Sequence, residues 1–185
     1  MALGIHPANA IENPEEIYEN LYGWIENDQI VAIGEIGLED LTENEISVFK
    51  KQLDIADETK SKVIIHTPRK NKKEVLKEIL EILPQHLDEK LAVVDHINPD
   101  VVGEAIASEC MLGLTVQPQK MEKEDAIAIL DEYGFDRFLL NSDISNKPSD
   151  PLSVAKTVRE LTRRGYDNSD IEKISHRNAQ KFFKI

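Results

Sequence analysis

Six short apolar runs, each followed by a longer charged segment with helical periodicity, constrain the fold of this chain most strongly. The runs are rich in valine, isoleucine and leucine and do not alternate with polar residues, which is typical of strands that are covered on both faces. They lie at Ala2–Ile5, Ile30–Ile36, Lys62–Ile65, Leu91–Val94, Met111–Val116 and Phe138–Leu140. Strands that alternate with helices need right-handed crossover connections, so the pattern predicts a parallel sheet.

The segments between the apolar runs carry signals for helices. Pro14 suits the first turn of a helix, with Asn13 as its N-terminal cap. Thr42 and Glu45 predict a capping box at the start of the next helix. The resulting strand–helix units fit an open doubly wound sheet or most of a (β/α) barrel. No glycine-rich phosphate loop follows any run, which disfavours the nucleotide-binding form of the open sheet.

The composition narrows the class of protein. Residues 1–185 are 41% hydrophobic, which is enough for a single domain with a sizeable core. The formal net charge of -13 argues against broad binding to nucleic-acid backbone or anionic membrane, although a local cluster could still contact one phosphate. Cys110 is the only cysteine and suits a reducing compartment. Without a signal peptide or an apolar run near the roughly 20 residues of a membrane span, we predict a cytoplasmic protein.

Side chains that can bind metals or move protons stand at the ends of the predicted strands. They are His6, Glu35, His66, Asp95, His96, Gln117 and Asp143. The carboxyl ends of parallel strands converge on one mouth, so we expect these groups to meet there. Imidazole and carboxylate together suit a divalent ion such as zinc, manganese or iron. A bound ion lowers the pKa of its water to roughly 7, so the predicted chemistry is hydrolysis.

Several of these residues also have a simpler interpretation. A single histidine after a strand, such as His6, is often a hydrogen-bonded loop residue. Glu35 could pair with Arg69 or a lysine, and Asp143 could serve as a cap or turn residue. We favour the metal site because independent causes would not repeatedly choose the same end of the strand. A cation would also offset the cost of placing the Glu35 carboxylate in the most strand-like run.

Five stretches of the sequence resemble the TatD family of metal-dependent hydrolases, within the amidohydrolase superfamily. They are GIHP at 4–7, GEIGLE at 34–39, VIIHTPR at 63–69, VVDH at 93–96 and LLNSD at 139–143. The stretches HTPRKNK, GLTVQP and NAQKFF are similar to the archaeal branch of the family. The resemblance covers essentially the whole chain. It implies a TIM-type barrel, incomplete, with about six of the eight strand–helix units present.

The resemblance also implies roles for the residues at the strand ends. Glu35 would bridge two metals, and His66 and His96 would complete one metal site with it. Asp143 would hold the other metal or act as the general base. Glu35 and Asp143 are therefore the candidate catalytic residues. The expected cofactor is one or two divalent ions, with zinc, manganese and magnesium as the alternatives.

The substrate implied by the resemblance is a small phosphoester or a nucleic-acid end, with deoxyribonuclease-like activity. Arg69 would meet a substrate phosphate, and His6 would line the pocket. Arg69, Lys70, Lys72 and Lys73 form a basic cluster that could hold one or two phosphates, although solvated lysines at a helix start are the simpler interpretation. Two other functions stay open: a catalytically impaired barrel that acts as a binding or scaffold protein, and an amidase or lactonase of the same superfamily.

Two departures from the family pattern qualify the resemblance. The family usually has Glu-Thr-Asp at the last strand, where this chain has Asn141, Ser142 and Asp143. The family also opens with a strand that carries His-x-His, and this sequence contains no His-x-His. We therefore predict a domain that is truncated at the N-terminus relative to the family. The alternatives are a short protein with one usable metal site and a barrel that has lost catalysis; open barrel edges would invite self-association.

Overall fold

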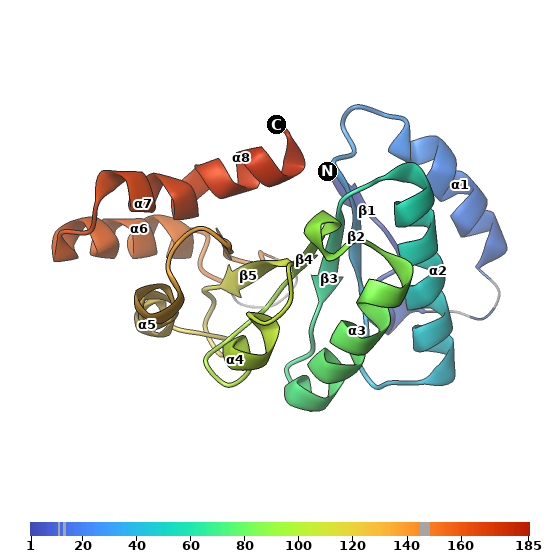
Figure 1. The fold of residues 1–185 in the computed structure, drawn as a ribbon, viewed down its shortest axis with the longest axis horizontal. Helices are drawn as coiled ribbons and strands as arrows, with labels where there is room; N and C mark the ends of the chain where they lie inside the picture. Colours follow the sequence, from blue (N-terminus) through green and yellow to red (C-terminus); the bar gives the residue numbers. More distant parts are fainter. Residues whose placement is uncertain (11, 13, 145–148) are drawn as a thin grey trace.

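The computed structural model describes residues 1–10, 12, 14–144 and 149–185, and its strands alternate with helices. The strands are β1 (Ala2–Leu3), β2 (Ala32–Gly37), β3 (Val63–His66), β4 (Ala92–Val94), β5 (Met111–Thr115) and β6 (Phe138–Asn141). They form one parallel sheet in the order β1-β2-β3-β4-β5-β6 (Figure 1). Each strand pairs with the next along the chain, as in a (β/α) barrel, whereas a doubly wound sheet reverses its order at a switch point.

The barrel-type α/β fold predicted from the sequence is thus confirmed. In the described part of the chain, β1 and β6 end the strand order and do not pair with each other. The self-association predicted for such edges stays a prediction, as does the assignment of residues 1–185 to a single truncated domain.

The helices lie at the sides of the sheet. They are α1 (Glu15–Ile25), α2 (Glu43–Thr59), α3 (Lys72–His86), α4 (Val102–Ala105), α5 (Lys123–Tyr133), α6 (Ser153–Arg164), α7 (Asn168–Glu172) and α8 (Asn178–Phe183). Figure 1 shows α1–α3 beside the first strands and α5–α8 beside the last ones. Among the described residues, no helix is both long and apolar enough to cross a membrane. Asn13, the predicted cap of α1, lies outside the described residues.

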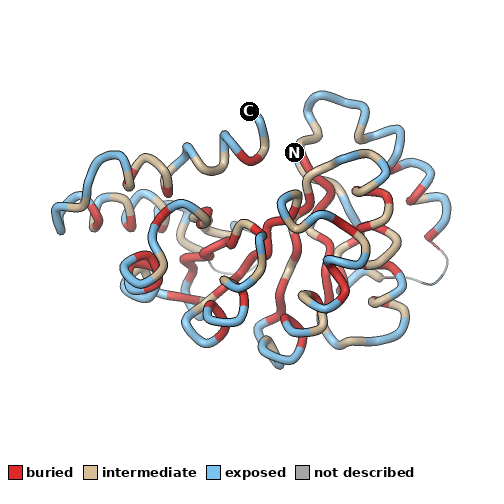
Figure 2. Tube along the Cα trace, in the orientation of Figure 1, coloured by how far each residue is buried: buried red, intermediate tan, exposed pale blue. Residues whose placement is uncertain are grey.

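Apolar side chains from both faces of the sheet are buried, and Figure 2 shows that the buried residues follow the strands. Ala92 and Val94 of β4 belong to the main core, which also includes Phe49 and Leu53 of α2. Val93 points to the opposite face, because successive side chains of a strand alternate. There it joins a smaller cluster with Leu139 of β6 and Phe182 of α8. Strands β2, β4 and β5 are therefore largely covered on both faces, as their continuous apolar runs predicted, whereas β1 and alternate residues of β3 are only partly buried.

The loop between β2 and α2 is held by the start of the helix. Thr42 caps α2, and its Oγ1 accepts a hydrogen bond from the backbone N–H of Glu45 at 3.2 Å. The reciprocal bond of the predicted capping box is replaced by another arrangement. Glu45 Oε2 accepts the backbone N–H groups of Glu39, Asp40 and Leu41 at 3.0, 2.9 and 3.1 Å. One carboxylate thus fixes the segment that carries Glu39 toward the mouth of the sheet.

Candidate metal centre

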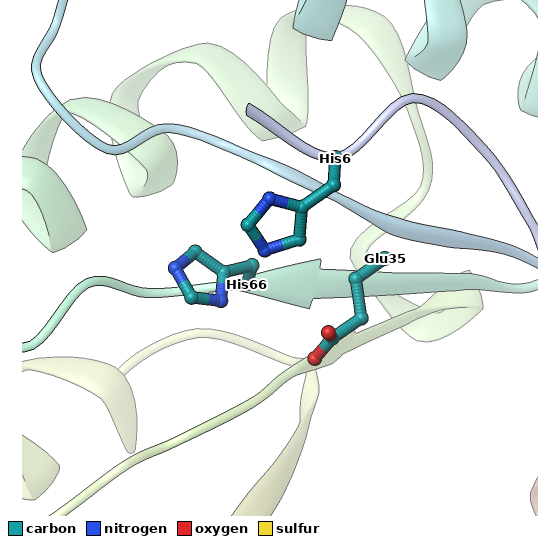
Figure 3. Close-up of side chains that lie close together, drawn as sticks. All are labelled: His6, Glu35 and His66. Atoms are coloured by element: carbon teal, nitrogen blue, oxygen red, sulfur yellow. The ribbon is translucent and has the colours of Figure 1, made fainter. Parts of the chain in front are cut away.

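Five of the strand-end residues gather at the carboxyl ends of β1–β4. They form two adjoining groups, one of His6, Glu35 and His66 and the other of Glu35, Asp95 and His96. In each group the potential ligand atoms lie within 4.8 Å of one another. Figure 3 shows the two imidazole rings of the first group and the Glu35 carboxylate turned toward a common space. Glu35 belongs to both groups, and its side chain is 32% exposed rather than fully buried.

The proton on the His66 ring is positioned by Glu39. His66 Nε2 lies 2.8 Å from Glu39 Oε2, and a carboxylate can only accept, so Nε2 carries the proton. His66 Nδ1 is therefore left with a lone pair, and this buried atom has no hydrogen-bond partner among the described residues. Burial, together with the neighbouring His96 and His6, lowers the pKa of His66 to about 3, so the ring is neutral at pH 7.

The position of the proton on the His96 ring is determined in a similar way, by a hydrogen bond to Thr115. Its Nδ1 lies 2.7 Å from Thr115 Oγ1, and that hydroxyl donates to Asp95 Oδ1 at 3.3 Å. The hydroxyl proton is thus used on Asp95, so His96 Nδ1 donates to Thr115 and His96 Nε2 keeps a lone pair. This Nε2 lies 3.3 Å from Glu35 Oε1. Two imidazole lone pairs that face one carboxylate are a donor set that fits a divalent cation.

Asp95 supports His96 from the interior of the sheet. Its Oδ1 accepts hydrogen bonds from the His96 backbone N–H at 2.7 Å and from Asn141 Nδ2 at 2.8 Å. Burial alone would raise the pKa of Asp95, but His96 and these hydrogen bonds hold it below the ordinary value. Gly113 gives this carboxylate its space, because a Cβ there would lie 1.9 Å from Asp95 Oδ1. Asn141, where the family usually has glutamate, thus serves as a donor to a neighbouring acid.

Asp143 lies beside these groups and belongs to neither of the two described. Lys120 Nζ contacts its Oδ2 at 2.5 Å and also lies 3.3 and 3.4 Å from the two ring nitrogens of His96. Asp143 has a φ of 44°, a left-handed conformation that is uncommon outside glycine and often found at functional sites. Lys120 therefore connects Asp143 to His96.

Arg69 does not pair with Glu35, which removes the simpler interpretation of that carboxylate. Its Nη2 donates instead to Gln117 Oε1 at 3.0 Å, and Gln117 Nε2 donates to the Asp143 backbone oxygen at 2.6 Å. Within the described ranges, no lysine or arginine lies within ion-pair distance of Glu35, whose carboxylate contacts His96 Nε2 at 3.3 Å. The cation that the sequence interpretation required for Glu35 is thus not supplied by a lysine or arginine of the described chain.

Three residues of the site were missed by sequence reasoning. Glu39 and Thr115 set the protons on the two histidines, and Lys120 contacts Asp143. Glu39 ends the GEIGLE stretch and Thr115 ends β5, so both stand at strand ends like the predicted ligands. Lys120 lies in the loop after β5. A search of the strand-end loops for cations as well as ligands would have found it.

A parallel sheet with imidazole and carboxylate groups at the carboxyl ends of its strands defines a class of protein, the metal-dependent hydrolases built on (β/α) barrels. A family model described as TatD related DNase matches residues 1–184. The chain therefore belongs to the TatD family of metal-dependent hydrolases, as its motifs predicted, and is an enzyme of that family.

The relatives agree with this assignment. An uncharacterized metal-dependent hydrolase of Methanocaldococcus jannaschii is 36% identical, over 100% of this chain and 74% of the relative. The crystal structure of a TatD-like protein from Archaeoglobus fulgidus matches with a TM-score of 0.80 and 34% identity, over 100% of this chain and 71% of the other. A 3'-5' ssDNA/RNA exonuclease TatD of Pectobacterium carotovorum is 25% identical, over 98% of this chain and 76% of the relative. The higher identity to the archaeal proteins agrees with the predicted branch.

Proposed function

We propose that this protein hydrolyses phosphoesters with one or two divalent ions, held by Glu35, His66 and His96, while Asp143 accepts a proton from the attacking water. One observation carries the proposal: the buried Nδ1 of His66 has a lone pair but no partner among the described residues, and it faces the same space as Glu35. An unpaired buried polar atom is costly, and a metal ion would satisfy it.

A divalent ion in such a site supplies Lewis-acid chemistry, because it polarises the scissile bond and makes water acidic near neutral pH. The chain's own residues do the rest. To act as general base, the Asp143 carboxylate must be held in place and must be ionised. The ion pair with the Lys120 ammonium favours both. Arg69 presents a guanidinium for a phosphate oxygen.

His6 acts in this proposal as a hydrogen-bond donor to the substrate. Its Nδ1 accepts the backbone N–H of Ala8 at 3.1 Å, so the proton of the neutral ring lies on Nε2. A protonated Nε2 cannot ligate a metal but can donate to a substrate oxygen. The group of His6, Glu35 and His66 would therefore offer two metal ligands and one donor.

The bond class and the location are part of the proposal. The ssDNA/RNA exonuclease among the relatives favours a phosphoester, and a nucleic-acid end suits an acidic surface better than a long polyanion does. Cys110 is free and buried, which agrees with the cytoplasmic location that we propose.

The test measures metal content and turnover in the same preparations. We expect wild-type protein to retain a divalent ion after dialysis and to hydrolyse bis(4-nitrophenyl) phosphate with added Mn²⁺. Glu35→Gln and His96→Ala should lose both properties, with turnover falling on the order of a thousandfold, since several kcal/mol of transition-state stabilisation are removed. His86→Ala is the matched control, because His86 lies on α3 and pairs with Asp54.

Equal and negligible metal in wild type and variants would contradict the hydrolase proposal and favour the scaffold alternative. Metal retention with cleavage of an aryl ester or lactone, and none of the phosphodiester, would favour the amidase or lactonase alternative.

A further inference from the structure

A small cavity lined by cations adjoins the candidate metal centre. It encloses about 180 Å³, and its lining includes Thr67, Arg69, Lys72, His96, Asn98 and Lys120. The volume is below the ~300–1,000 Å³ of pockets for drug-sized ligands, so the cavity suits a single small group. The His96 side of the cavity connects it to the residues that would hold the metal.

Lys72, in the first turn of α3, is half-buried against neutral oxygens only. Its Nζ donates to Thr67 Oγ1 at 2.8 Å, to the Thr67 carbonyl oxygen at 3.4 Å and to the His96 carbonyl oxygen at 2.9 Å. No carboxylate of the described residues lies within ion-pair distance of it. An ammonium group removed from water without a counter-charge is costly, so this position calls for an anion.

The other two cations of the cavity, Arg69 and Lys120, differ in whether a carboxylate pairs with them. Arg69 donates to the neutral amide oxygen of Gln117 at 3.0 Å, whereas Lys120 is paired with Asp143. Arg69 and Lys72 thus bring two positive charges with no carboxylate partner in the described chain. The nearby Lys73 shows the contrast: it is exposed and pairs with Glu104 at 2.9 Å.

We propose that this cavity binds a phosphomonoester group through Lys72 and Arg69. A phosphomonoester is a tetrahedral dianion near neutral pH, so it matches two uncompensated cations in charge and the cavity in size. Because the cavity adjoins the metal centre, the substrate is a phosphoester that carries a terminal phosphate beside the bond to be cleaved. This last step rests on the proposed function, but the binding of phosphate does not.

The first experiment measures inorganic phosphate binding to metal-free protein by calorimetry in the presence of EDTA. We expect saturable binding to wild type, at least about tenfold weaker binding to Lys72→Met, and wild-type affinity for Lys73→Met, since Lys72 lines the cavity and Lys73 does not. Arg69→Gln tests the same site if Lys72→Met fails to fold, as judged by thermal unfolding. Absence of saturable binding to wild type, or equal affinity in wild type, Lys72→Met and Arg69→Gln, would overturn the inference.

The second experiment compares two substrates with Mn²⁺, the 4-nitrophenyl ester of thymidine 5'-phosphate with and without a phosphate on the 3' oxygen. We expect a higher kcat/KM for the ester with the second phosphate, and we expect Lys72→Met to remove the difference. Equal kcat/KM for both esters in wild type would overturn the substrate assignment. Phosphate binding without cleavage of either ester would support the phosphate site and contradict the hydrolase proposal.

Discussion

The carboxyl ends of β2–β4 and those of β5–β6 both carry a carboxylate, but the two carboxylates differ in whether a lysine or arginine pairs with them. In the first region, the unpartnered Nδ1 of His66 and the Nε2 of His96, which also lies 3.4 Å from Lys120 Nζ, face Glu35, and no lysine or arginine of the described chain pairs with that carboxylate. In the second region, the charge of Asp143 is met by Lys120. The first region is therefore prepared for a cation from outside the chain, whereas the second supplies its own. In the proposed function, this division would separate the residues that hold the metal from the residue that accepts the proton.

Asp143→Asn separates the two regions most sharply. We expect turnover to fall by about 10²–10⁴-fold, because a general base contributes that much, while the metal content stays at the wild-type level. Turnover and metal content after dialysis provide the two readouts, and Asp150→Asn is the control, because Asp150 pairs with Lys156. Unchanged turnover would remove Asp143 from the proposed mechanism. Loss of metal would show that Asp143 also takes part in metal binding.

Glu39→Gln tests the first region through a residue that touches no substrate. The amide can donate to His66 Nε2, which would move the ring proton to Nδ1 and block the lone pair. We expect the affinity for Zn²⁺ or Mn²⁺ to fall about 10–100-fold, as is usual when a partner of a metal-binding histidine is lost. The measurement is a metal titration by calorimetry, with Glu58→Gln as the control on the exposed end of α2. Wild-type affinity for the metal would show that Glu39 does not determine which nitrogen of His66 carries the proton.

Gly113→Ala tests the packing that holds both regions together, since the new Cβ would meet Asp95 Oδ1 at 1.9 Å. We expect the free energy of unfolding in urea to fall by about 1–3 kcal/mol, the usual cost of overpacking. Gly103→Ala is the matched control: its nearest neighbour would be the Tyr133 hydroxyl at 4.0 Å, and it lies in α4, where alanine should stabilise by roughly 0.5–1 kcal/mol. Equal stability of the two variants would contradict the tight fit around Asp95.

The last prediction concerns the pH dependence of the metal-free protein. The pKa of His66 is lowered to about 3 in the folded chain and is 6.5 without the fold. Between these values the unfolded chain binds more protons, so the free energy of unfolding should fall as the pH falls from 7 toward 4, with His66 contributing at most roughly 1.4 kcal/mol per pH unit. His66→Gln should flatten this dependence and His176→Gln should not. An unchanged slope in His66→Gln would contradict the burial of a neutral ring.

The sequence predicted the strands and their ends well, because continuous apolar runs and the parallel order leave few alternatives. His66 and His96 meet Glu35 for that reason. The contacts made by the loops were less predictable from the sequence. Glu45 was expected to bond back to its own helix start and instead holds the loop before it. Such contacts depend on how a loop returns toward the sheet, and local sequence signals do not encode that path.

The position of Lys120 illustrates the same limit. It lies three residues after Gln117 in the chain, yet its contacts are with His96 and Asp143, which are 24 and 23 residues away. The sequence indicates only that Asn141 stands where the family has a carboxylate, whereas its role as a donor to Asp95 depends on how β4 and β6 lie in the sheet. Pairwise roles of this kind require the three-dimensional arrangement.

Arg69 and Lys72, which are proposed to bind phosphate, lie within a chain whose formal net charge is -13. A polyanion is repelled by the net negative charge once it comes within about one Debye length, ~8 Å at physiological ionic strength, and would be attracted only when an end of it enters the cavity. Salt screens the long-range repulsion first, so association with oligonucleotides should become faster as the ionic strength rises, opposite to the usual trend for nucleic-acid-binding proteins. The acidic surface would thereby act as a filter that admits short anions and free ends and turns away the middle of long strands.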